Sequence, residues 1–170
     1  MLGSTRNSVI EQEQRLTAPY INLAMAYRHK GNEKLAEENL LKALAIDQAQ
    51  PVANNELGIL YRKQGRFDDA KKVYINALSE YPDYLPVIKN LGILCDIYMR
   101  DPHCALEQFE KYQQHVPEDK TVKVWIADLK TRIYVNRSNE SIRYYMCCID
   151  YVIQPGGGRG QGAVRYFDYR

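Results

Sequence analysis

The chain has 170 residues and a formal net charge of +2, with acidic and basic residues interspersed along its length. This length corresponds to one domain, and a hydrophobic fraction of 45% is ordinary for a globular protein with its own core. No run of lysines and arginines is dense enough to hold phosphate groups, so we expect no nucleic-acid partner. No apolar stretch approaches the roughly 20 residues of a membrane-spanning helix, so we expect no membrane span.

The cysteines and the N-terminus bear on the compartment. The four cysteines are Cys95, Cys104, Cys147 and Cys148, and none of them forms a Cys-x-x-Cys pair. The first 15 residues contain no apolar segment followed by a cleavage site, so we expect no secretory signal. We therefore expect reduced thiols in a cytoplasmic protein, with the periplasm as the alternative if the chain is a processed or truncated form.

Residues 1–16 are mostly polar and are expected to form an N-terminal arm or a partial helix. A helix is predicted to begin near Thr17, because Pro19 suits a first helical turn, where its missing N–H is not needed. Helical spacing then relates Tyr20, Leu23, Ala24 and Tyr27. Gly31 breaks this helix, and a second helix of the same period is predicted before the polar exit at Asp47.

The stretch from Pro51 to Tyr84 repeats this two-helix pattern 34 residues later. The matching pairs are Leu23 with Leu57, Ala24 with Gly58, Tyr27 with Tyr61, Gly31 with Gly65, Ala36 with Ala70, Leu40 with Tyr74 and Ala43 with Ala77. Small residues at these positions let two helices approach closely, and the large ones fill the space between them. A period of this length with small residues at fixed offsets indicates stacked repeats.

A third copy of the pattern, residues 85–118, is less regular. Leu91 and Gly92 match the earlier copies, but Cys95 stands where they have a tyrosine. The glycine between the helices is missing, and we expect one extra residue in its place, within residues 99–102.

The repeats resemble the tetratricopeptide repeat family, with its pattern Trp-x-x-Leu-Gly-x-x-Tyr, then Ala-x-x-x-Phe, then Pro. The residues that carry it are Leu57, Gly58, Tyr61, Ala70, Tyr74 and Pro82. Asn54 departs from the tryptophan position. The resemblance implies an all-α, right-handed superhelical array of about three helix-turn-helix repeats followed by a capping helix. The expected segments are an arm at 1–16, repeats at 17–50, 51–84 and 85–118, a capping helix at 119–134 and a tail of uncertain structure at 135–170.

An amphipathic helix is predicted after Asp119, which can cap it. Its apolar stripe consists of Val122, Trp125, Ile126, Leu129 and Ile133. Such a helix suits the end of an array, because one face covers the last repeat and the other meets water. Residues 142–152 are apolar and rich in tyrosine, and residues 155–162 form a glycine-rich linker.

The resemblance also implies a binding surface. Repeats of this family bind partners through a concave face formed by the first helix of each repeat. On that face we expect the partner-binding residues Met25, Arg28, Asn55, Ile59, Arg62, Lys89, Ile93 and Asp96. Polar side chains around an apolar floor suit an extended peptide or a helix of another protein. The implied function is a non-enzymatic adaptor or scaffold.

No catalytic, cofactor or metal site is indicated. The histidines and cysteines lack the paired spacing of structural zinc sites. The glycine run has no lysine and serine or threonine after it, as a phosphate-binding loop requires. Some relatives clamp a C-terminal carboxylate with basic residues, but Glu56 lies at one of the matching positions and would repel it.

Two alternatives remain within the binding class. The chain could associate with itself, as a homodimer, through its apolar tail. It could instead be a regulatory fragment of a larger assembly, because it also resembles bacterial repeat proteins, some of which are envelope proteins that assist pilus assembly.

Overall fold

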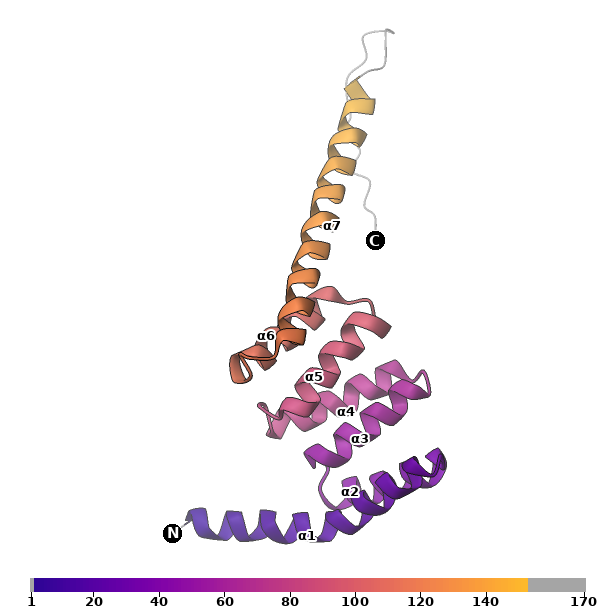
Figure 1. The fold of residues 1–170 in the computed structure, drawn as a ribbon, viewed down its shortest axis with the longest axis vertical. Helices are drawn as coiled ribbons and strands as arrows, with labels where there is room; N and C mark the ends of the chain where they lie inside the picture. Colours follow the sequence, from indigo (N-terminus) through magenta and orange to yellow (C-terminus); the bar gives the residue numbers. More distant parts are fainter. Residues whose placement is uncertain (1, 153–170) are drawn as a thin grey trace, which may run out of the picture. The chain divides into compact units, whose positions relative to one another are not determined.

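The computed structural model describes residues 2–152, with side-chain placement for residues 16–136. Every element in this range is a helix, so the predicted all-α architecture is confirmed (Figure 1). The helices are α1 (Leu2–His29), α2 (Glu33–Ile46), α3 (Pro51–Lys63), α4 (Phe67–Glu80), α5 (Leu85–Ile93), the π-helix η1 (Leu94–Tyr98), α6 (Pro102–His115) and α7 (Lys120–Val152). The chain divides into two compact units, the first ending at Ile133 and the second beginning at Tyr134.

The first unit consists of helix pairs that follow one another: α1 with α2, α3 with α4, and α5 with α6. The turn within each of the first two pairs contains a glycine, Gly31 or Gly65, with φ +76°. A side chain is strained at such a positive φ, so glycine suits these turns. The pairs α3 with α4 and α5 with α6 lie within residues 51–84 and 85–118, whereas α1 begins before residue 17.

Close approach within a pair depends on a glycine of the first helix. A Cβ atom at Gly58 would overlap the ring of Tyr74, and one at Gly92 would overlap the ring of Phe109. Tyr74 and Phe109 are fully buried and come from the second helix of the same pair. The pattern of small and large residues therefore sets the distance between the two helices.

The extra residue of the third repeat lies in its first helix and not in the turn, which corrects the sequence-based prediction. The helix widens into the π-helix η1, in which Met99 N donates to Leu94 O at 3.0 Å. A π-turn absorbs one inserted residue without ending the helix. The turn itself is preserved, because Arg100 takes the left-handed conformation of the earlier glycines, with φ +54°.

Cys95 and Cys104 form a disulfide between η1 and the start of α6, so the prediction of reduced thiols is wrong for these two residues. Their Cα atoms are 5.8 Å apart, within the range that a disulfide spans. Sequence spacing did not reveal the pair, because the turn between two helices brings the cysteines together. Cys95 is fully buried. The side chains of Cys147 and Cys148 lie outside the described placement.

The N-terminal helix differs from its predicted start, because α1 begins at Leu2 and continues through Pro19. Proline often marks the start of a helix, but a helix can continue through it with the loss of one backbone hydrogen bond. The outward face of α1 is exposed: Leu23 is 44% exposed, whereas Leu57 at the same repeat position is 1% exposed. The reason is that α2 covers α3, while no described helix precedes α1.

At the other end of the first unit, α7 buries Val122, Ile126 and Leu129, as the predicted stripe requires. Trp125 packs against Phe109 of α6, with 5.2 Å between ring centroids. The helix continues to Val152, beyond the predicted end near residue 134. The predicted linker at 155–162 lies outside the described residues.

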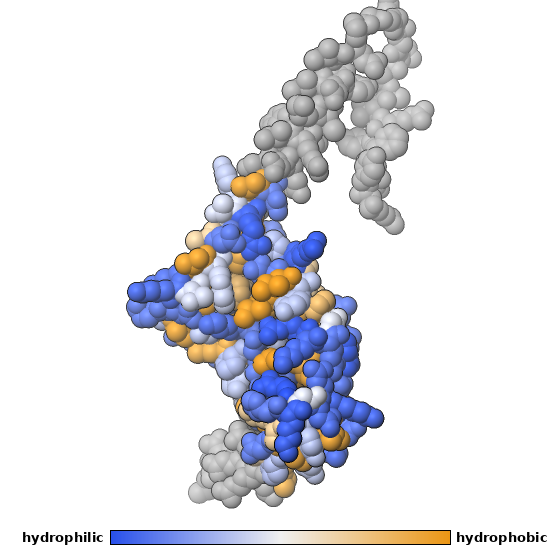
Figure 2. All heavy atoms as spheres, turned by 45° about the vertical axis from the view of Figure 1, so that its right-hand side comes forward, coloured by the Kyte–Doolittle hydropathy of each residue, from blue (hydrophilic) through white to orange (hydrophobic). Residues whose placement is uncertain are grey.

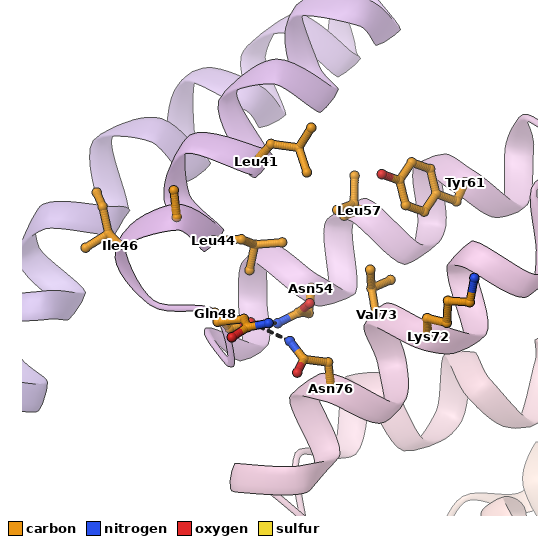
Figure 3. Close-up of a pocket in the computed structure, with 11 residues that line it drawn as sticks. Leu41, Leu44, Ile46, Gln48, Asn54, Leu57, Tyr61, Lys72, Val73 and Asn76 are labelled. Atoms are coloured by element: carbon orange, nitrogen blue, oxygen red, sulfur yellow. Dashed lines mark hydrogen bonds between the residues drawn. The ribbon is translucent and has the colours of Figure 1, made fainter.

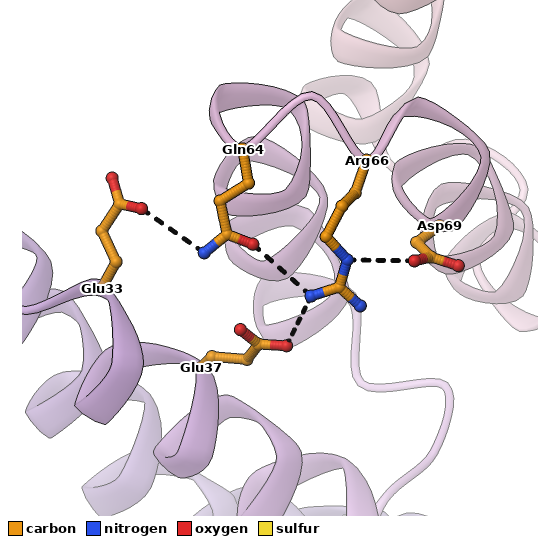
Figure 4. Close-up of polar contacts among 5 residues, drawn as sticks. All are labelled: Glu33, Glu37, Gln64, Arg66 and Asp69. Carbon is orange, nitrogen blue, oxygen red and sulfur yellow. Dashed lines mark hydrogen bonds and ion pairs between the residues drawn. The ribbon is translucent and has the colours of Figure 1, made fainter.

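A polar network joins the first two repeats (Figure 4). Arg66 donates to Glu37 of α2 at 2.9 Å and to Asp69 of α4 at 3.0 Å. Its guanidinium also lies 3.8 Å from the ring centre of Tyr61. Arg66 therefore links α2, α3 and α4 across the repeat boundary.

On the face shown in Figure 2, apolar side chains form small patches among hydrophilic ones. None of the described helices is long and apolar enough to cross a membrane.

Candidate functional site

The candidate site is the face of α1, α3 and α5 that carries the eight predicted binding residues. Asn55, Ile59 and Arg62 are spaced by four and three residues on α3, so they lie on one side of that helix. The third repeat places Lys89, Ile93 and Asp96 in the same way, and the first contributes Met25 and Arg28. We call this surface the first-helix face.

An apolar row crosses the first-helix face. Met25, Ile59 and Ile93 occupy the same position in three successive repeats, and each is half-buried. Met25 and Ile93 pack with one side on the hydrophobic core. The three helices therefore place one half-buried apolar side chain per repeat on this face.

The polar residues of this face pair with one another across repeat boundaries. Arg28 of the first repeat contacts Glu56 of the second, with 2.6 Å between Nη1 and Oε2. Asn90 Nδ2 of the third repeat donates to Asn55 Oδ1 of the second at 2.9 Å. These contacts brace α1, α3 and α5, whereas the sequence-based expectation had Arg28 and Asn55 directed toward a partner.

The same bracing continues onto α7. Lys89 Nζ donates to Asp119 Oδ2 at 2.9 Å, and Arg132 Nη2 donates to Asp96 Oδ1 at 2.6 Å. Lys89 also lies 4.9 Å from the ring centre of Tyr112. Two of the three predicted binding residues of the third repeat, Lys89 and Asp96, therefore contact α7 or the residue that precedes it.

Arg62 is the exception among the predicted cations, because no acidic partner is placed against it among the described residues. Its guanidinium carbon lies 5.7 Å from the ring centre of Tyr98, and its buried Nη1 has no hydrogen-bond acceptor within the described range. The pKa of the Tyr74 phenol is raised by burial, and the nearby Arg62 charge opposes that rise.

Burial and the charge of Glu56 both affect the pKa of Tyr84, which lies near this face. Burial raises the pKa of the Tyr84 phenol, and the negative charge of Glu56 adds to the rise. Arg28 offsets that charge through its ion pair. Among the described residues no group of three histidine, cysteine or acidic side chains is arranged to hold a metal ion.

Two family models, each described as "Tetratricopeptide repeat", match residues 18–50 and 51–84. The two matches abut at the boundary between the first two helix pairs, in the register of the structure. This chain is a tetratricopeptide repeat protein.

Two relatives of this tetratricopeptide repeat protein are assembly proteins by name. It is 33% identical over 138 residues to the type IV pilus assembly protein PilF of Pseudomonas aeruginosa, covering 79% of the chain and 52% of PilF. It is 24% identical over 127 residues to the photosystem I assembly protein Ycf3 of Prochlorococcus marinus, covering 72% of the chain and 71% of Ycf3. The chain thus spans about half the length of PilF.

Solved structures share the fold at lower identity. The first tetratricopeptide repeat domain of Spaghetti (RPAP3), bound to the HSP90 peptide SRMEEVD, superposes with a TM-score of 0.64 at 14% identity, covering 69% of this chain and 95% of that domain. The crystal structure of MamA gives a TM-score of 0.63 at 19% identity, covering 85% of this chain and 82% of MamA. These likenesses show a common fold and carry no information about ligands.

Sequence reasoning missed the partners of the predicted residues in this tetratricopeptide repeat protein: Glu56, Asn90, Tyr98, Asp119 and Arg132. Each lies roughly one repeat further along the chain than the residue it contacts. Opposite charges about one repeat apart were the available signal for Glu56, Asp119 and Arg132, whereas nothing in the sequence indicated Asn90 or Tyr98.

The contact between Lys89 and Asp119 predicts a pH dependence. Asp119 also accepts from Thr121 N and Val122 N at the start of α7, at 3.0 and 3.1 Å. The Lys89 ammonium, together with these N–H groups, lowers the pKa of the Asp119 carboxyl. The folded state therefore favours the charged carboxylate more than the unfolded state does. Its stabilising effect is complete above the unfolded pKa of about 3.9 and is lost as the pH falls through the lowered folded value.

We therefore expect Asp119→Asn to lower the stability at pH 7. The deficit should persist down to about pH 5 and shrink below about pH 4. Urea unfolding of parent and variant at several pH values measures it. Glu118→Gln, an exposed neighbour that makes none of these contacts in the structure, serves as control and should change stability little. A deficit that is equal at pH 7 and pH 3 would contradict this role of the charge.

Proposed function

We propose that the first-helix face binds a segment of a partner protein, and that the chain is a non-enzymatic adaptor. The observation that carries the proposal is the apolar row formed by Met25, Ile59 and Ile93. Burying such side chains against a partner contributes about 25 cal/mol for each Å² of apolar surface removed from water. One apolar contact per repeat suits a helix or an extended segment lying across the three first helices.

The bracing contacts support this proposal in a second way. A surface that is already ordered loses little conformational freedom when a partner binds. The pairs Arg28 with Glu56 and Asn90 with Asn55 hold the first helices in register before binding. They also leave little uncompensated charge beside the row, so the apolar side chains and Arg62 would select the partner.

Arg62 adds a polar requirement. Because it has no acidic partner among the described residues, a carboxylate or carbonyl oxygen of the bound segment is the group expected beside it. We therefore propose a partner segment that combines apolar side chains with an acidic residue near its centre.

The test uses peptides selected for binding to the whole chain from a random display library. Replacing Ile59 by glutamate is expected to weaken the best of them at least about tenfold, or about 1.4 kcal/mol, because a charge then faces the apolar contact. The matched control is Ile75→Glu, since Ile75 is 52% exposed on α4 and lies on the second helix of its repeat. Equal binding by the Ile59→Glu variant and the parent would refute the proposed site.

Reversing the charges of Arg62 and Lys89 together would be a less specific test than the isoleucine variants. Lys89→Glu would bring a second carboxylate to Asp119 and disturb the start of α7. Loss of binding in that variant could therefore result from disturbed folding as well as from loss of a contact with the partner. The isoleucine variants avoid this difficulty.

The disulfide and the likeness to PilF support an assembly role in an oxidising compartment. Disulfides persist in the periplasm and are rare in the cytoplasm of ordinary bacteria, so Cys95–Cys104 favours the periplasmic alternative. PilF is a pilus assembly protein by name, and we propose that this chain likewise assists assembly of an envelope complex.

Self-association through residues 142–152 stays a prediction, because those side chains lie outside the described placement.

A further inference from the structure

A pocket lies between the first two repeats, on the side of their second helices (Figure 3). It has a volume of about 770 Å³ and is lined by α2, α3, α4 and the loop before α3. Leu44, Leu57 and Val73 line one part of it, and the exposed Leu41 and Ile46 also contribute. Gln48, Lys72 and Asn76 line the polar part. None of these residues belongs to the first-helix face, so the pocket is separate from that face.

The pocket exists because two side chains are short. At the repeat position of Asn54, the first and third repeats carry Tyr20 and Ile88. Between the second and third repeats, Lys111 Nζ donates to Pro82 O at 2.6 Å. Asn76, at the matching position between the first and second repeats, is shorter, and its Nδ2 donates to Gln48 O. The middle repeat therefore leaves unfilled the space that a large side chain would occupy.

Asn54 gives the pocket a polar requirement. Its Nδ2 donates to Gln48 O at 2.9 Å and to Gln50 O at 3.1 Å, which fixes the orientation of the amide. Asn54 is fully buried, and its Oδ1 has no hydrogen-bond partner among the described residues. Figure 3 shows that this oxygen points away from Gln48. An unsatisfied buried acceptor is costly, so a donor entering with an apolar group would be favoured.

We propose that this pocket receives a tryptophan side chain from a partner protein. The indole ring is large and apolar, and its single polar group is an N–H donor, so it can contact the leucine and valine side of the pocket while its N–H faces the free oxygen of Asn54. The volume lies within the range of sites that enclose small ligands. A second copy of the chain cannot easily supply the ring, because its only tryptophan, Trp125, already packs on Phe109. The proposal is independent of the first-helix face and goes beyond it.

The test titrates N-acetyl-tryptophanamide into the whole chain and follows the methyl resonances of Leu44, Leu57 and Val73. Saturable shifts at these methyls are expected. The same compound methylated on the indole nitrogen cannot donate to Asn54 and should bind about tenfold more weakly. N-acetyl-phenylalaninamide, which lacks the donor, should behave like the methylated compound.

Variants at position 54 separate shape from hydrogen bonding. Asn54→Leu keeps the side-chain volume and removes the acceptor, so both indole compounds should bind it equally. Asn54→Trp fills the space from within and should abolish binding. Both variants are expected to fold, because the third repeat already buries Ile88 at this position. Asn22→Leu, an exposed change on α1, is the control and should leave the titration unchanged.

Three results would overturn the proposal. The first is no saturable shift at any of the three methyls in the parent chain. The second is equal affinity of the parent for the tryptophan compound and its methylated form. The third is a shift that appears only after Tyr166 and Tyr169 of the tail are replaced by serine, which would assign the pocket to the tail of this chain.

Discussion

Replacing Tyr74 by alanine is expected to destabilise the protein by about 3–5 kcal/mol, as for other large buried aromatics cut to alanine. Tyr74 is fully buried, and its ring fills the space that Gly58 leaves between α3 and α4. Removing the ring leaves a cavity that the two helices cannot close without moving. Urea unfolding followed by circular dichroism measures the loss, and a loss below about 1 kcal/mol would contradict this packing.

The contact between Gly58 and Tyr74 can be isolated by a double-mutant cycle. Gly58→Ala alone is expected to cost about 1–3 kcal/mol, because the new methyl group overlaps the Tyr74 ring. In the Tyr74→Ala background the same change should cost little. The loss of stability in the double variant should therefore be smaller than the sum of the losses in the two single variants. Gly92→Ala is the control, because Gly92 faces Phe109, and its effect should add to that of Tyr74→Ala.

Tyr61→Ala is expected to have an effect of similar size, about 3–5 kcal/mol. Tyr61 is buried between α2 and α4, and Arg66 lies over its ring at 3.8 Å. Tyr27 occupies the same repeat position but is only half-buried, because no described helix covers α1. Tyr27→Ala should therefore cost clearly less.

Thermal and urea unfolding of the two tyrosine variants make the comparison, with Tyr61→Phe as a variant that keeps the ring and should lose little. Equal losses for Tyr27→Ala and Tyr61→Ala would contradict the account in which the preceding helix pair, by covering this repeat position, sets the cost of losing the ring.

The sequence predicted the repeats because their packing depends on residue size. Gly58 and Ala70 mark close approaches, and Tyr61 and Tyr74 fill the spaces beside them, so spacing alone indicates the helix pairs. The same reasoning misplaced the inserted residue of the third repeat. A missing glycine suggested an altered turn, but Arg100 accepts a positive φ and the π-helix absorbs the insertion.

The candidate site was predicted only as a set of positions. Repeat register indicated which side chains share the face with Ile59, but it did not indicate that Arg28 and Lys89 are already paired. Those contacts join residues about 30 positions apart, and they depend on how tightly successive repeats stack. The pocket beside Asn54 was missed for a related reason: the sequence showed a departure from the tryptophan position, but only the structure showed that no neighbour fills the space.

The disulfide and the exposed face of α1 depend on tertiary contacts in the same way. Cys95 and Cys104 carry no recognisable spacing, and only the fold of η1 onto α6 brings them together. Leu23 has the same residue type and repeat position as Leu57, yet it is exposed because α1 has no described neighbour on that side. Burial at a repeat position therefore depends on the neighbouring repeat as well as on the residue.

Photo-crosslinking in the native host tests directly whether the first-helix face is the binding surface. Benzoylphenylalanine is placed at Ile59, in the apolar row, or at Glu107, exposed on the second helix of the third repeat. We expect a partner protein to be captured from position 59 and not from position 107, and the capture to be lost when Met25 is also replaced by glutamate. Capture of the same partner from position 107 alone, or equally from both positions, would contradict binding at the first-helix face.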